Sequence, residues 1–178
     1  MIFHETELEG AYLIELEKHE DSRGFFARSF CRKEFEKNGL NPKVMQANLS
    51  YSQSRGTLRG LHYQVQPHAE AKFVRCTSGS IYDVIVDLRP ESSSYRQWLG
   101  IELLAKAHKM IYVPEGFAHG YLTLADHTEV MYQVSEFYAP NVEKGIRWND
   151  PYFAIKWPET ETLLISEKDQ GWPDWLTL

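Results

Sequence analysis

Short apolar stretches recur along the chain with Gly, Pro, Asn and Ser between them. The clearest is SIYDVIVDLR, whose positions fall into two alternating sets: Tyr82, Val84, Val86 and Leu88, and Ile81, Asp83, Ile85 and Asp87. A period of two is the pattern of a β-strand with two different faces. Similar stretches are AYLIEL, GFFARSF, KVMQANLSY, AKFVRCTSG, HKMIYVPEG, GYLTLAD and EVMYQVSEFY. Strands this numerous predict an all-β sandwich or barrel rather than a parallel α/β sheet.

One segment has the pattern of a helix, from Cys31 to Asn38, with Ser29 or a neighbour as cap and Gly39 as terminator. The last forty residues are rich in Trp, Pro and Asp, and we expect irregular structure laid over the barrel there. The 178 residues contain no internal repeat and no linker. They therefore predict a single domain, residues 1–178.

Composition narrows the possible functions. The net charge of −6 argues against general DNA or RNA binding, although a local basic pocket for a small phosphorylated ligand remains possible. No window has the length of a membrane-spanning helix, and MIFHETELEGAY lacks the features of a secretory signal. Cys31 and Cys76 match no metal or redox spacing. We expect a cytoplasmic protein with reduced thiols, no nucleic-acid partner and no membrane partner.

Two histidines occur inside strand-like or turn-like patterns, in RGLHYQ and PEGFAHG. Alternate side chains of a barrel strand point into the lumen. If His62 points inward, Gln64 does too, and Gly60 leaves space just before them. His119 follows a Pro-x-Gly turn and would enter the same mouth from another strand. These segments resemble the two motifs of the cupin jelly roll.

The first cupin-like motif consists of Gly56, His62, Gln64, Glu70 and Gly79, and the second of Pro114, Gly116 and His119. A metal-binding cupin normally has a second His at the position of Gln64. An amide is a poor replacement among the N, S and carboxylate donors that such metals favour. We therefore expect no metal. The alternatives are a metal-dependent oxygenase and two core histidines satisfied by hydrogen bonds.

Four polar residues accompany these histidines: Arg59, Lys72, Tyr132 and Asp169. Arg59 and Lys72 are expensive to bury without an anionic partner, and a phosphorylated ligand would supply one. Both could instead reach solvent at the barrel mouth. Tyr132 shares a strand face with valines and by itself would more often be core. Asp169 could orient a histidine, although a loop Asp is usually only solvated.

The chain resembles the dTDP-4-dehydrorhamnose 3,5-epimerases almost from end to end. The matching stretches, in family order, are DSRGFFARSF, QANLSYS, LRGLHYQ, AKFVRC, GSIYDVIVDLR, VPEGFAHGYLTL, EFYAP, IRWNDP, IKWP and ISEKD. The resemblance implies a cofactor-free enzyme that inverts C3 and C5 of a nucleotide-linked 4-keto-6-deoxy sugar. It also implies a homodimer in which an N-terminal segment completes the neighbour's site.

The resemblance implies a role for each candidate residue. His62 is the general base, Asp169 orients it, Tyr132 is the acid on the opposite face, and Lys72 stabilises the enolate oxygen. The expected substrate-binding residues are Arg23, Gln46, Asn48, Arg59 and Lys168 at the nucleotide diphosphate, with His119 and Tyr138 near the sugar.

The residue types suit this chemistry. C3 and C5 are both alpha to the C4 ketone, so their protons are acidified, and a cation at the developing oxyanion stabilises the enolate. A neutral histidine is a suitable base near neutral pH. Inversion needs a proton donor on the other face, which a tyrosine supplies. No hydride or electron moves, so no cofactor is needed.

Three features depart from the family pattern. Arg28 stands near a position that is commonly acidic and close to the nucleoside, so the nucleotide could differ from dTDP. Glu70 stands where an amide often precedes the lysine, and RPESSSYRQW lacks the usual loop glycine. Epimerisation at one carbon only and a CDP-linked substrate are alternatives because they would use the same catalytic residues. A sugar-nucleotide binder without activity is a further alternative, and the intact set of His62, Tyr132 and Asp169 argues against it.

Overall fold

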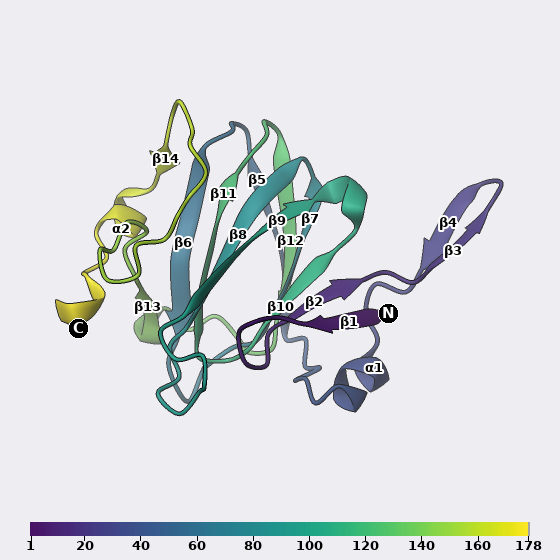
Figure 1. Ribbon diagram of the computed structural model, residues 1–178, viewed down its shortest axis with the longest axis horizontal. Coiled ribbons are helices and arrows are strands. Elements are labelled where there is room, and N and C mark those ends of the chain that lie inside the picture. The colour runs from purple at the N-terminus through teal and green to yellow at the C-terminus, as the bar shows by residue number, and fades with distance from the viewer. Residues whose placement is uncertain (178) are drawn as a thin grey trace.

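The computed structural model describes residues 1–177, with the side chain of Thr177 excepted. Residue 178, which closes the predicted domain, lies outside the described residues, and the single-domain organisation stays a prediction. Two sheets face each other in the body of the molecule, as Figure 1 shows. Together with a few short helices they make the cupin-like jelly roll that the strand pattern and the two motifs predict.

The first sheet has the strand order β1-β2-β10-β7-β12-β5. Its strands are β1 (Ile2–Glu5), β2 (Tyr12–Glu15), β10 (Met110–Val113), β7 (Lys72–Ser78), β12 (Thr128–Val134) and β5 (Gln46–Ser52). The second sheet has the order β13-β6-β11-β8-β9, and β14 pairs with β6 in parallel. Its strands are β13 (Glu143–Gly145), β6 (Thr57–Gln64), β11 (Phe117–Thr123), β8 (Ser80–Asp87), β9 (Trp98–Leu104) and β14 (Leu164–Ile165). A separate hairpin joins β3 (Lys18–Asp21) to β4 (Gly24–Ala27).

The main core lies between the two sheets. It joins Val74 and Ile111 of the first sheet to Ile81, Ile85 and other apolar residues of the second. Ile81 and Ile85 belong to one of the two alternating sets of SIYDVIVDLR, whereas Val84 and Val86 pack on the opposite face. Both faces of β8 are therefore covered, each by a different apolar cluster.

The helix α1 (Arg32–Lys37) confirms the one helical pattern of the sequence. The N-cap residue is Cys31, two residues after Ser29, and its side chain makes no cap hydrogen bond. Gly39 has φ +72, the left-handed conformation that ends a helix and that glycine adopts without a steric penalty. The helix packs Phe35 onto Phe73 and Tyr112 on the outer face of the first sheet.

Residues 139–177 are largely irregular, as expected for the end of the chain, and run beside β6 (Figure 1). They bury Ile146, Phe153 and Ile155 against Leu61 and Val84 of the second sheet. The short helix α2 (Glu167–Gln170) lies in this segment. Further single turns of 3-10 helix span Ala105–Ala107, Pro140–Val142 and Trp175–Thr177. Within residues 1–177, no helix is both long enough and apolar enough to cross a membrane.

Candidate active site

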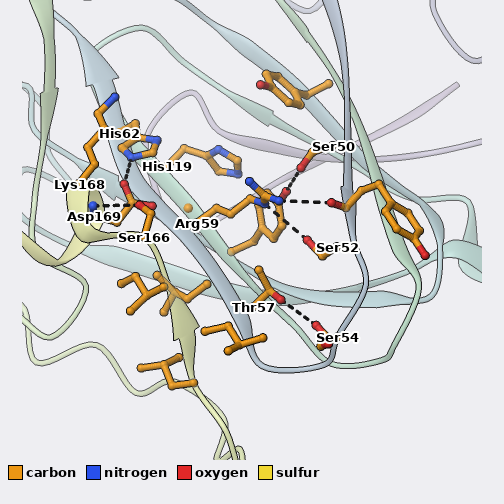
Figure 2. A pocket seen from close by; sticks show the side chains of 18 of the residues that line it. Ser50, Ser52, Ser54, Thr57, Arg59, His62, His119, Ser166, Lys168 and Asp169 are labelled. Carbon is orange, nitrogen blue, oxygen red and sulfur yellow. Dashed lines mark hydrogen bonds and ion pairs between the residues drawn. The ribbon is translucent and has the colours of Figure 1, made fainter.

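Two adjoining cavities open between the sheets, with volumes of about 820 Å³ and 390 Å³. The larger is lined by β5, β6 and β11 together with residues 163–169, and Figure 2 shows this lining. The smaller is lined by the ends of β5, β6, β7 and β12. Three side chains line both cavities: His62, Lys72 and Tyr132. They come from three strands in two sheets, so a ligand at this junction would meet all of them.

A bulge in β6 determines which of its side chains reach the cavity. His119 of β11 pairs with His62 of β6, and Tyr121 pairs with Arg59. The two partners are two residues apart on β11 but three residues apart on β6, so β6 contains one extra residue. In a regular strand, Arg59 and His62 would point to opposite faces because they are three residues apart. The extra residue brings both into the larger cavity. Gly60 lies at the bulge with φ +119, where a Cβ atom would come within 2.5 Å of the Gly120 Cα.

His62 is paired with Asp169 across 107 residues of sequence, with 2.6 Å between His62 Nε2 and Asp169 Oδ1. Asp169 lies in α2, where the Ser166 hydroxyl accepts a hydrogen bond from its backbone N–H. Burial acts to raise the pKa of the Asp169 carboxyl. The hydrogen bond and charge of His62 and the Gly60 N–H outweigh burial and hold that pKa below its ordinary value. An ionised carboxylate can only accept, so Nε2 is the donor, and in the neutral imidazole Nδ1 is then the nitrogen with the free lone pair.

His119 forms a second pair of the same kind. Its Nε2 lies 2.8 Å from Oδ2 of Asp83, a fully buried residue on the neighbouring strand β8. Within the part of the chain that the structure describes, no group of three or more His, Cys, Asp and Glu side chains could hold a metal ion. Each of the two cavity histidines instead has a carboxylate partner, an arrangement that fixes the ring and its tautomer.

Tyr132 and Lys72 reach the junction of the two cavities from the first sheet. Burial is the largest cause that raises the pKa of the Tyr132 phenol; Glu70 and Glu143 raise it further, and Arg59 acts in the opposite direction. The phenol therefore stays protonated at neutral pH and can donate a proton. The Lys72 ammonium is paired with the Glu70 carboxylate, and both side chains are largely buried.

Comparison with known proteins identifies the family. The model of the dTDP-4-dehydrorhamnose 3,5-epimerase family matches residues 5–176. The chain is 44% identical to the dTDP-4-dehydrorhamnose 3,5-epimerase of Methanothermobacter thermautotrophicus over 96% of this chain and 92% of that one. This chain belongs to the dTDP-4-dehydrorhamnose 3,5-epimerase family. It is a nucleotide-sugar epimerase, as the sequence motifs predict.

Solved structures of related enzymes are similar over nearly the whole chain. The family enzyme from Bacillus anthracis, with TDP and PPi bound, has a TM-score of 0.92 and 44% identity, covering 97% of this chain and 98% of that one. ChmJ, a 3'-monoepimerase from Streptomyces bikiniensis in complex with dTDP-quinovose, has a TM-score of 0.90 and 32% identity, covering 98% and 88%. The fold therefore accommodates both double and single epimerisation.

Most of the substrate-binding residues expected for this epimerase family line the two cavities. Arg59, His119 and Lys168 line the larger cavity, and Gln46, Asn48 and Tyr138 line the smaller one. The Arg59 guanidinium donates to the Tyr51 carbonyl at 3.2 Å. Lys168 and Tyr138 both donate to Glu143, at 2.6 Å and 2.8 Å. Sequence reasoning missed Glu143, because a carboxylate at the start of a strand of only three residues carries no periodic signal.

Arg23 does not join this group within its own chain. It lies in the turn of the β3–β4 hairpin, which projects away from the two sheets (Figure 1). Its side chain is 88% exposed and pairs with Asp21 at 2.6 Å. Arg28, the residue that departs from the epimerase family pattern, follows the same hairpin and lies 3.9 Å from Glu34. The structure thus keeps both arginines out of the cavities of their own chain.

Gln64 occupies the position of the missing metal ligand, and the structure gives it another task. Its amide donates to the carbonyls of His68 at 2.8 Å and Phe137 at 3.2 Å, and accepts from the Ala139 N–H at 2.6 Å. It thereby joins β6 to the loop before β7 and to the segment that carries Tyr138. In this epimerase the amide holds together two walls of the smaller cavity.

Proposed function

We propose that this enzyme inverts C3 and C5 of dTDP-4-dehydro-6-deoxy-D-glucose to give dTDP-4-dehydro-L-rhamnose. In this proposal His62 is the base and Tyr132 the acid, acting through an enolate. The observation that supports this proposal is the placement of His62 and Tyr132. Both line the same two cavities, from strands of opposite sheets, and His62 is paired with Asp169. A sugar ring at the junction would expose one face to each group.

The reaction uses His62 Nδ1 to take the proton from a carbon alpha to the C4 ketone, leaving an enolate. The Lys72 ammonium stabilises the negative oxygen, and this interaction is strong because Lys72 is largely buried. Tyr132 then returns a proton to the opposite face, which inverts the centre. Asp169 holds the imidazole in the required tautomer throughout. The steps transfer protons only, so the proposal needs no cofactor and no metal.

Cations and hydroxyl groups in the larger cavity suit an anionic diphosphate. Arg59 and Lys168 contribute positive charge, and Ser50 and Ser52 contribute hydroxyl groups, as Figure 2 shows. Arginine forks match phosphate oxygens in pairs, whereas lysine acts as a point charge. This lining supports a nucleoside diphosphate as the carrier of the sugar.

The choice among substrates and outcomes is tested by solvent exchange. We expect the enzyme, incubated in deuterated water with the dTDP-linked ketosugar, to place deuterium at both C3 and C5, measured by NMR. Deuterium at one carbon would support a monoepimerase. Exchange only with the CDP-linked sugar would identify CDP, rather than dTDP, as the nucleotide of the substrate. Absence of exchange with either substrate would contradict the proposed function and favour a binding protein without activity.

We also propose that the enzyme is a homodimer in which the β3–β4 hairpin of one copy contributes Arg23 to the other copy's site. The hairpin leaves Arg23 and the apolar Phe26, 71% exposed, without cover from their own chain. Leu49, 64% exposed, and Met131 form a second apolar area on the outer face of β5 and β12. Burying such surface in a symmetric interface would stabilise the dimer.

Mixed dimers test this sharing. Arg23→Ala should weaken substrate binding strongly because a charged phosphate contact is lost. We expect co-expression of Arg23→Ala and His62→Ala chains to restore about a quarter of wild-type activity. Half of randomly formed dimers would be mixed, and one of their two sites would contain both intact residues. If Arg23 acted within its own chain, every site of the mixed dimer would carry one defect and no activity would return.

A further inference from the structure

Glu70 is a largely buried carboxylate that the proposed mechanism does not use. It lies in the connection between β6 and β7, two residues before Lys72, and lines the smaller cavity together with His62 and Tyr132. Its Oε1 forms an ion pair with the Lys72 ammonium, and the two side chains are 11% and 9% exposed. An anion therefore lies beside Lys72, which lines both cavities.

The position of Glu70 is itself fixed by hydrogen bonds. Gln64 Nε2 lies 3.5 Å from Glu70 Oε2, and the same amide donates to the His68 carbonyl at 2.8 Å. The next residue, Ala71, donates its N–H to the Ser135 hydroxyl at 2.8 Å. The carboxylate is thus held on a loop that is attached on both sides, whereas a lysine side chain has four flexible carbons.

We propose that Glu70 is a positioning residue for the reaction, acting through Lys72. Its carboxylate takes one of the three N–H donors of the ammonium and holds the other two toward the junction where His62 and Tyr132 meet. A buried ammonium also needs a compensating charge before substrate arrives, and Glu70 supplies it. This inference rests on the proposed function, because the enolate oxygen is the group that the held ammonium would meet.

Two substitutions separate the hydrogen bond from the charge. Glu70→Gln keeps an acceptor for Lys72 and removes the charge; Glu70→Ala removes both. We expect Glu70→Ala to lower kcat for exchange at C3 and C5 by about ten- to a hundredfold, with KM changed less than about twofold, because misplaced catalytic groups slow the chemical step. Glu70→Gln should recover only part of that loss, because the amide restores the acceptor for Lys72 but leaves the ammonium without its compensating charge. Glu102→Gln, on the exposed part of β9, is the matched control and should match wild type.

A double-mutant cycle with Lys72→Met decides whether Glu70 acts through the lysine. We expect Glu70→Ala to cause no further loss of kcat in the Lys72→Met background. Multiplicative losses in the cycle, or wild-type kcat in Glu70→Ala, would overturn the proposal. If Glu70→Ala does not fold, as judged by circular dichroism, the same cycle with the near-isosteric Glu70→Gln gives the answer. Failure of the proposed function would appear separately, as wild-type enzyme that exchanges neither carbon.

Discussion

His62→Ala is expected to lower deuterium exchange at both C3 and C5 by at least about a thousandfold, since a positioned base contributes this much in general acid–base catalysis. The same imidazole would serve both carbons, so both rates should fall together. The fold should persist, because the His62 side chain is 31% exposed and the Asp169 carboxylate keeps the Gly60 N–H as a partner. The measurement is NMR of the sugar after incubation in deuterated water, with circular dichroism to confirm folding.

His68→Ala is the matched control, because His68 contributes its backbone carbonyl rather than its ring to the hydrogen bonds of Gln64. It should exchange both carbons at the wild-type rate. Exchange at the wild-type rate in His62→Ala would show that another group removes the protons. Loss of exchange at one carbon alone would show that His62 is the base for that carbon and that another group removes the proton from the other.

Tyr132→Phe should separate proton removal from inversion. The phenyl ring keeps the packing of the tyrosine while the proton donor is lost. We expect the formation of inverted product to fall by about a hundredfold or more. His62 can still take a proton and return a deuteron to the same face, so exchange with the starting configuration should fall less. Product configuration and deuterium content, both read by NMR, distinguish the two processes.

Tyr82→Phe is the control for the loss of a hydroxyl, because Tyr82 lies on the far face of β8 against Trp157. Tyr82→Phe should behave as wild type.

The pKa of Tyr132 is raised above its ordinary value of 10.0, first by burial and then by Glu70. A raised pKa keeps the phenol protonated, so the rate should not decline through ionisation of Tyr132 below about pH 10. Inverted product at the wild-type rate in Tyr132→Phe would contradict the assignment.

Local pattern in the sequence was sufficient for the architecture. The alternation in SIYDVIVDLR predicted β8, and the segment ended by Gly39 predicted α1, because both elements are specified by near neighbours and by which faces are covered. Short strands without a strict alternation, such as β1, β9 and β13, gave no such signal. The family motifs also predicted the epimerase class, which the comparisons confirm.

Tertiary structure decided how the candidate residues are arranged. The sequence alone could not reveal that the bulge at Gly60 turns Arg59 and His62 to the same side, since that depends on the pairing of β6 with β11. It also could not place Arg23 outside the cavities of its own chain or give the Gln64 amide its three backbone partners. Pattern and motif depend on neighbours along the chain, whereas these contacts join residues that only folding brings together.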